Sequence, residues 1–133
     1  MTNFSSDPTR AELEILHVLW RLKTASVRQV WEALGSKGSY TTVLKLLQVM
    51  LEKGLVTRDE SKLSHVYAAA VDRTVNQERM VSGLIDRAFG GSVSELILRA
   101  LSAKPASTEE LETIRTLLAE AKSKPARKKD AGK

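Results

Sequence analysis

Four polar residues lie at helical spacing between residues 39 and 53, namely Thr41, Lys45, Gln48 and Glu52. Because positions four, seven and eleven apart share one face of an α-helix, these side chains are expected to face solvent together, opposite the apolar residues of the segment. Threonine, lysine and glutamine can all hydrogen-bond to DNA base edges or phosphates. The stripe therefore has the chemistry of a DNA-reading surface, although a merely solvated helix face is the alternative for any single stripe.

Further polar and basic residues flank this stripe. Short polar side chains and unpaired backbone N–H groups at the start of the segment would suit a phosphate. Basic residues before the segment and in the region that follows it would bracket a DNA groove. The candidate contacts are Lys37, Ser39, Tyr40, Thr41, Lys45, Gln48, Arg58 and Lys62.

No arrangement typical of an active site or a metal centre accompanies the stripe. The chain has no cysteine, which excludes disulfides, thiolate metal sites and cysteine nucleophiles. No third ligand or triad partner stands near His17 or His65 in the sequence. We expect His17 to be a partly buried packing residue and His65 to have a structural or DNA-backbone role. The prediction is a protein that is not an enzyme and has no cofactor or metal.

Apolar residues at helical spacing predict three short helices in the first 53 residues. The first helix covers residues 9–23, the second follows Ser26 and ends at Gly35, and the third covers residues 39–53 and ends at Gly54. Serine or threonine with capping-box spacing precedes each of the first two helices. The first helix is apolar around much of its circumference, which is typical of the central helix of a small bundle. The two tryptophans lie on inward stripes and are expected in the core.

A two-stranded hairpin is predicted directly after the third helix. Residues 55–59 and 64–69 are rich in β-branched and aromatic side chains and flank a polar turn at residues 60–62. A lone hairpin is marginally stable, so it must pack against the helices. Three helices followed by a hairpin are typical of a winged helix-turn-helix, in which the helix before the hairpin enters the major groove. The predicted fold class is mainly α with a small β-hairpin wing.

Three amphipathic helices are predicted after residue 72, separated by Gly90–Gly91 and by Pro105. Residues 71–123 carry seven basic and eight acidic side chains, and this near-neutral balance suits packing against another helix set better than DNA binding. Their apolar stripes exceed what so small a unit can cover alone, so we predict a dimerisation region, with a monomeric extension of the core as the alternative. The predicted interface residues are Leu84, Ile85, Phe89, Val93, Leu96, Ile97, Leu101, Leu111, Ile114 and Leu118.

The formal net charge of +5 is concentrated at the end of the chain. Residues 124–133 carry five basic residues and one acidic residue, and their composition predicts a disordered tail. The tail is either a solubilising end or an arm that adds salt-sensitive phosphate contacts. The predicted domains are a winged helix-turn-helix at residues 1–71, a helical dimerisation domain at 72–123 and the tail at 124–133.

The apolar runs and the N-terminal segment bear on localisation. The longest apolar run, residues 66–71, is far shorter than the roughly 20 residues of a membrane-spanning helix. The first ten residues lack the basic and apolar regions of a secretory signal. We therefore expect a cytoplasmic protein without a membrane partner.

Several short motifs, in order and spacing, resemble the penicillinase-repressor (BlaI/MecI) family of bacterial transcription regulators. They are AELEIL at residues 11–16, YTTV at 40–43, LL at 46–47, KGLV at 53–56, VY at 66–67, AFGG at 88–91 and STEEL at 107–111. The resemblance covers roughly residues 7–121. It implies a homodimeric, sequence-specific DNA-binding repressor on a palindromic operator, commonly one that controls β-lactam resistance genes. It also adds Thr42 to the candidate DNA contacts.

The chain departs from this family pattern at three places. Val49 stands where many members have arginine and Lys45 where they have threonine, which predicts different operator contacts. The resemblance implies an inactivating protease as a partner, since staphylococcal members are cut at an Asn-Phe bond. Arg99 and Ala100 occupy the place of that bond here, so this chain lacks the matching cleavage sequence. The copper-responsive relatives use C-terminal cysteines, and the lack of any cysteine in this chain excludes thiolate copper sensing. A winged-helix protein-interaction module without specific DNA binding is the competing functional class.

Overall fold

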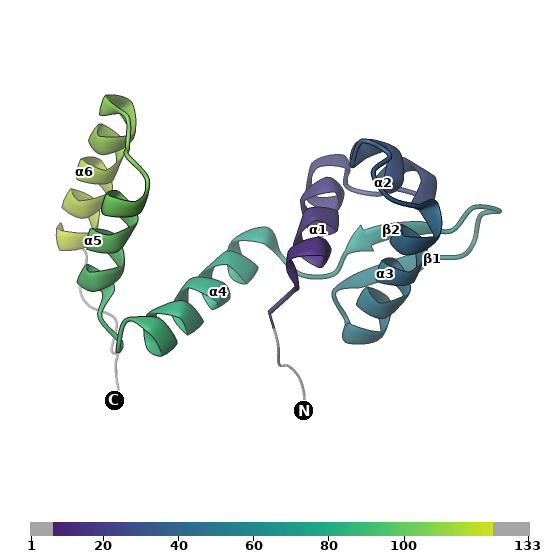
Figure 1. Ribbon diagram of the computed structural model, residues 1–133, viewed down its shortest axis with the longest axis horizontal. Coiled ribbons are helices and arrows are strands. Elements are labelled where there is room, and N and C mark those ends of the chain that lie inside the picture. The colour runs from purple at the N-terminus through teal and green to yellow at the C-terminus, as the bar shows by residue number, and fades with distance from the viewer. Residues whose placement is uncertain (1–6, 124–133) are drawn as a thin grey trace. The chain divides into compact units, whose positions relative to one another are not determined.

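The computed structural model describes residues 7–123, which contain six helices and one antiparallel hairpin (Figure 1). The order of the elements is three helices, two strands and three further helices. The predicted fold class, mainly α with a β-hairpin wing, is thereby confirmed. The chain divides between Gly83 and Leu84 into two compact units, and the predicted basic tail lies outside the described residues.

Helices α1 (Arg10–Leu22) and α2 (Val27–Ala33) begin as their sequences predict. The Thr9 side chain accepts a hydrogen bond from the Glu12 backbone N–H, and the Glu12 carboxylate accepts one from the Thr9 N–H at 2.9 Å. Ser26 and Gln29 form the same reciprocal capping box before α2. Each box satisfies two N–H groups that the first helical turn leaves without a partner, so both helix starts are fixed locally.

Helix α3 (Tyr40–Lys53) has one capped end and one glycine-terminated end. Ser39 is its N-cap, and Gly54 follows the helix with a φ of 81°. This left-handed backbone conformation favours glycine, and it places the Leu55 N–H 2.9 Å from the Met50 carbonyl oxygen. The chain therefore leaves α3 in a defined direction and enters the hairpin.

The core of the first unit lies between α1, α2, α3 and the hairpin. Its residues are apolar and almost wholly removed from solvent, which is the main source of the unit's stability. They include Ile15, Leu16, Leu19, Val30, Val43, Leu47, Met50, Val56 and Tyr67.

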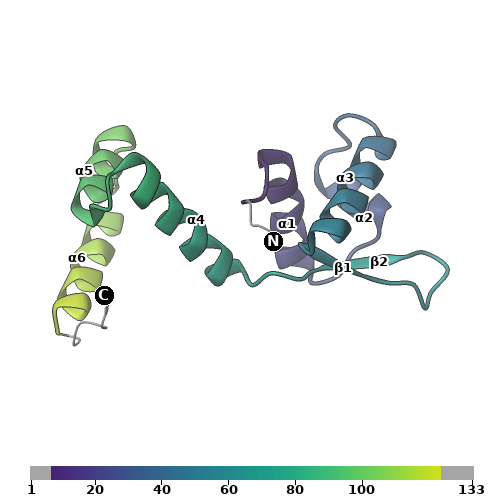
Figure 2. The ribbon, with the colours of Figure 1, turned by 90° about the horizontal axis from the view of Figure 1, so that it is seen from below.

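The hairpin pairs β1 (Val56–Asp59) with β2 (Val66–Ala69), and its loop extends beyond the helices (Figure 2). Ala25, in the segment between α1 and α2, pairs with the hairpin, because Ala25 and Tyr67 exchange two backbone hydrogen bonds of 3.0 and 2.8 Å. This pairing fixes the hairpin to the helices, as the prediction of a dependent hairpin requires.

The remaining helices are α4 (Arg73–Ala88), α5 (Val93–Ala103) and α6 (Thr108–Ser123). Helix α4 begins in the first unit, and its last turn belongs to the second. The structural division thus falls inside α4, whereas the predicted division by function lies at residue 71 and stays a prediction. Positive φ values at Gly90 and Gly91 end α4, at the break that the sequence predicts.

Three aromatic residues of the first unit are less buried than the sequence predicts. His17 is exposed rather than partly buried, because the outer side of α1 that carries it is not covered. Trp20 and Trp31 pack against the core but stay half-exposed. Each indole N–H donates to a backbone carbonyl at the edge of the core, to Val71 and Gly38 respectively, and these bonds hold the rings at the surface.

Candidate nucleic-acid interface

The outer face of α3 carries the predicted polar stripe. Thr41, Lys45, Gln48 and Glu52 are all exposed, while the opposite face of the helix is buried in the core. None of the hydrogen bonds among residues 7–123 engages the side chains of Thr41, Lys45 or Gln48. These three donors and acceptors are therefore available to an external partner.

Ser39 and Thr42 serve the start of α3 itself. The Ser39 hydroxyl oxygen accepts from the Thr42 backbone N–H at 3.0 Å, and the two hydroxyl oxygens lie 2.9 Å apart. Both side chains thus satisfy each other and the helix end. Both side chains are exposed, but their main role is to cap the helix. The family resemblance and the polar stripe did not predict this role.

Tyr40 braces the turn between α2 and α3. Its ring meets Trp31 edge to face, with centroids 6.2 Å apart, and the Trp31 indole N–H donates to the Gly38 carbonyl oxygen at 3.3 Å. Aromatic pairs favour this geometry. Tyr40 therefore positions the first turn of α3, and part of its side chain stays exposed.

Lys37 lies beside the start of α3 rather than on its polar face. It lines a cavity of about 400 Å³ together with Ser39 and Thr42 of the helix start and Glu14 of α1. Its ammonium group adds positive charge near the N-terminus of α3. The structure thus brings three of the predicted contacts to one place.

The two basic residues predicted on the wing differ in their surroundings. Arg58 is half-buried and forms an ion pair with Glu60, and hydrogen bonds to Tyr67 and then Glu60 raise the pKa of its guanidinium above the ordinary value. Lys62 is exposed in the wing loop and takes part in no ion pair among the described residues. Lys62 is therefore the better placed of the two for a phosphate, and Arg58 chiefly stabilises the wing.

The loop between β1 and β2, residues 60–65, also contains Leu63, which the sequence analysis did not single out, and His65. Leu63 is fully exposed, and exposed His65 lies nearby in a cavity of about 420 Å³ that also includes Tyr40. The position of Leu63 next to the polar turn was the available signal. Asp59 stabilises the turn by accepting from the Ser61 N–H at 2.9 Å, and the side chain and backbone of Ser61 lower the pKa of Asp59.

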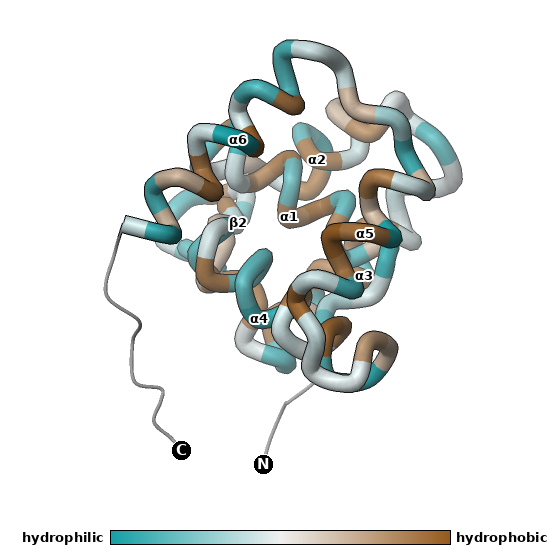
Figure 3. Tube along the Cα trace, turned by 90° about the vertical axis from the view of Figure 1, so that its left-hand side faces the viewer, coloured by the Kyte–Doolittle hydropathy of each residue, from teal (hydrophilic) through white to brown (hydrophobic). Residues whose placement is uncertain are grey.

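The predicted dimer residues are apolar side chains of the second unit that are exposed or half-exposed. No residue of α5 or α6 is buried, and the hydropathy view shows hydrophobic positions along α5 (Figure 3). Leu84, Val93, Ile97, Leu101, Leu111 and Leu118 are exposed, and Ile85, Phe89, Leu96 and Ile114 are half-exposed. The prediction omitted Leu98 and Leu117, which are also exposed.

Two kinds of feature are absent from the part of the chain that the structure describes. Residues 7–123 contain no cluster of three or more histidine and acidic side chains that could hold a metal ion. Within the same range, no helix has the length and apolar character needed to cross a membrane.

Comparison with known proteins identifies the family. The model of the penicillinase repressor family matches residues 8–120, and the chain belongs to this family. The chain is 22% identical to the methicillin resistance regulatory protein MecI of Mammaliicoccus sciuri over 120 residues, which are 89% of this chain and 98% of that protein. It is 24% identical to the penicillinase repressor of Bacillus licheniformis over 116 residues, or 86% and 91% of the two chains.

A solved structure is also similar to part of the chain. The DNA-binding domain of the repressor BlaI matches with a TM-score of 0.47 and 24% sequence identity, over 53% of this chain and 92% of that one.

Proposed function

We propose that this protein is a DNA-binding transcriptional repressor that acts as a homodimer on a palindromic operator. The observation that carries the proposal is the outer face of α3, where Thr41, Lys45 and Gln48 are exposed and have no partner among the described residues. Membership of the penicillinase repressor family supports it, since the relatives are named as a penicillinase repressor and a regulator of methicillin resistance.

The side chains on α3 match the donor and acceptor pattern of the major groove. Glutamine can bind adenine through two hydrogen bonds, lysine can donate to guanine, and threonine can contact either a base or a thymine methyl group. The N-terminal end of α3, with Ser39 as its cap, adds backbone N–H groups that suit a phosphate. In this proposal Lys45, Gln48 and Thr41 read bases, and the helix start fixes the register on the backbone.

Basic residues outside α3 supply contacts that do not depend on sequence. Lys62 in the wing loop and Lys37 before α3 are exposed and can each neutralise one phosphate. Each neutralised phosphate releases counterions, so binding should weaken as salt rises. Arg58 contributes through the shape of the wing because Glu60 already occupies its guanidinium.

The exposed apolar surface of the second unit supports a homodimer. Single exposed leucines are common in soluble proteins, but an extended apolar surface marks an interaction site. Here Val93 of α5 is 56% exposed and Leu118 of α6 is 57% exposed, and neither helix buries a residue. A second copy would cover this surface and hold two α3 helices for half-sites about 34–36 Å apart. Action on chromosomal DNA implies a cytoplasmic protein.

Titration against genomic fragments at physiological salt tests the proposal. A repressor should select fragments with an inverted repeat and bind them at least about 1,000-fold more tightly than random duplexes. Equal affinity for all fragments would instead favour a winged-helix protein-interaction module. Sedimentation velocity at micromolar concentration tests the dimer separately, since a monomer would contradict that part of the proposal.

Cleavage of this chain by a protease is a further way in which repression could be relieved, but the matching bond lies inside a helix. Arg99 and Ala100, at the place that matches the family's cleavage bond, lie inside helix α5, where Arg99 is 3.9 Å from Glu95. Incubation with a candidate protease followed by mass spectrometry would show whether any bond in α5 is cut.

A further inference from the structure

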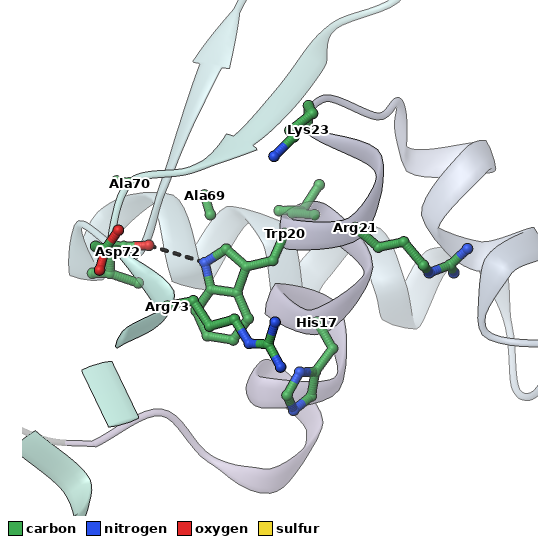
Figure 4. A pocket seen from close by; sticks show the side chains of 10 residues that line it. His17, Trp20, Arg21, Lys23, Ala69, Ala70, Asp72 and Arg73 are labelled. Carbon is green, nitrogen blue, oxygen red and sulfur yellow. Dashed lines mark hydrogen bonds between the residues drawn. The ribbon is translucent and has the colours of Figure 1, made fainter. Parts of the chain in front are cut away.

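An open cavity of about 820 Å³ lies in the first unit, where the end of α1, the end of β2 and the start of α4 come together. The indole of Trp20 forms one side of it, and Leu19 and Val71 add apolar surface (Figure 4). Small-molecule sites usually measure roughly 300–1,000 Å³ and combine apolar walls with a few polar groups. The cavity thus has the size and the lining of a ligand site, and it is separate from the polar face of α3.

Positive charge predominates in the lining of this cavity. Lys23 and Arg73 line it and take part in no salt bridge among the described residues, and Arg21 also lines it but its guanidinium points away from the indole (Figure 4). The one acidic residue in the lining is Asp72, and its carboxylate already accepts the Val75 backbone N–H at 3.1 Å at the start of α4. The local field therefore favours an anion.

The aromatic side of the cavity is held in place. The Trp20 indole N–H donates to the Val71 carbonyl oxygen at 3.0 Å, and His17 meets the indole edge to face at a centroid distance of 5.4 Å. In Figure 4 the guanidinium of Arg73 extends past the indole toward His17. A fixed indole next to a cation suits a ligand that carries both an apolar body and a negative charge.

The backbone at the cavity wall is strained. Lys23 has a φ of 76° and a ψ of −56°, a conformation that residues with a side chain rarely adopt, and its N–H is held by the Leu19 carbonyl oxygen at 2.8 Å. Strained residues persist where the surrounding structure enforces them, and they cluster at ligand sites. Lys23 is part of the lining of the cavity.

We propose that this cavity binds a small organic anion whose apolar or aromatic body packs on Trp20 and whose carboxylate pairs with Arg73. The concave aromatic wall favours such a ligand over the phosphate backbone of a nucleic acid, which would follow an open basic surface. The proposal does not depend on DNA binding, because its test detects the ligand directly.

Nuclear magnetic resonance of the ¹⁵N-labelled full chain provides that test. The sequence has two tryptophans, so the spectrum contains two indole N–H signals, and a Trp20→Phe variant assigns them. Benzoate should shift the Trp20 signal in a saturable manner and leave the Trp31 signal in place. Benzamide, which has the same shape without the charge, and inorganic phosphate, which lacks the apolar body, should shift it much less.

Variants in α4 locate the charge that matters. Arg73→Gln should weaken benzoate binding by at least about tenfold, while Arg79→Gln, an exposed change six residues further along the same helix, should leave it unaltered. The proposal is overturned if benzoate leaves the Trp20 signal unmoved at 10 mM (roughly the weak limit of specific fragment binding). It is equally overturned if benzamide or phosphate acts as strongly, or if Arg73→Gln binds as the unmodified protein does.

Discussion

The Lys53 ammonium at the end of α3 donates to the Glu12 carboxylate in the first turn of α1, with 2.8 Å between nitrogen and oxygen. Glu12 is 2% exposed and also completes the capping box with Thr9. One buried carboxylate therefore both caps the start of α1 and binds the end of α3. Because α3 carries the proposed DNA-reading face, this bond ties the end of that helix to the central helix of the unit.

Loss of the Glu12 charge should destabilise the first unit. Glu12→Gln retains a side chain suited to the capping box but removes the charge that Lys53 binds. The Lys53 side chain is 38% exposed, so we expect a loss of only about 1 kcal/mol in the free energy of unfolding. Glu12→Ala also removes the acceptor for the Thr9 backbone N–H and should cost about 2 kcal/mol. Urea denaturation measures both, with the exposed Glu14→Gln as the matched control, and equal values for Gln and Ala would contradict this division of roles.

The contribution of Glu12 should depend on pH. Burial acts to raise the pKa of Glu12, but hydrogen bonds from Lys53 and Thr9 outweigh it and hold the pKa below the ordinary value of 4.5. Because the folded-state pKa is depressed, the stabilisation is fully present above pH 4.5 and is lost as the pH falls through the folded-state pKa. The stability difference between the unmodified protein and Glu12→Gln should therefore shrink on acidification. A difference that stays constant from neutral to acid conditions would show that the charge of Glu12 is immaterial.

The N-cap of α3 should separate helix stability from DNA binding. Ser39→Ala removes the acceptor for the Thr42 N–H and should lower stability by about 1 kcal/mol. Ser39→Asp restores a good cap, yet its negative charge would repel a nearby phosphate. We therefore expect thermal melting to recover in Ser39→Asp while anisotropy shows weaker operator binding. If Ser39→Asp binds DNA as well as the unmodified protein, the start of α3 does not approach the backbone.

Residues on α3 and on the wing should differ in the kind of binding that they support. Lys45→Ala and Gln48→Ala should each reduce the preference for operator over random DNA by about 1–3 kcal/mol. Lys62→Ala should weaken both DNAs alike and lower the slope of log affinity against log salt by about one. Anisotropy titrations at several salt concentrations distinguish these cases, and the exposed Lys104→Ala serves as control. Uniform weakening by Lys45→Ala would place Lys45 on a phosphate instead of a base.

A charge on the apolar surface of α5 should separate the proposed dimer. Ile97→Asp places a carboxylate among exposed apolar residues, whereas Ser102→Asp places the same group on the polar side of the helix. Sedimentation velocity should give a monomer for the former and a dimer for the latter. Circular dichroism checks that both variants keep their helices, and a dimeric, folded Ile97→Asp would exclude this surface as the interface.

Local patterns in the sequence were sufficient for the elements of the first unit. The capping boxes at Thr9 and Ser26, the apolar spacing of α3 and the glycine that ends it all act between residues close in the chain, so their effects can be read directly. The same is true of the hairpin and of the polar stripe on α3. Family membership followed from the order of such motifs and is shown by the match over residues 8–120.

Contacts between residues far apart in the sequence could not be predicted from local patterns. The pairing of Ala25 with Tyr67 and the burial of Glu12 against Lys53 join segments about 40 residues apart, and no periodicity predicts them. For the same reason His17 was expected to be partly buried, although the tertiary packing leaves its side of α1 exposed.

The sequence by itself determined which helices and strands form and which face of α3 is polar, because both depend on spacing along the chain. Only the tertiary structure decided which polar groups are available. It engaged Lys53 with Glu12 and the Trp20 indole with the Val71 carbonyl, and it gathered Arg73 of α4 and Trp20 of α1 around one cavity. The physical reason is that hydrogen bonds and ion pairs form between groups that folding brings within a few ångströms, whatever their separation in sequence.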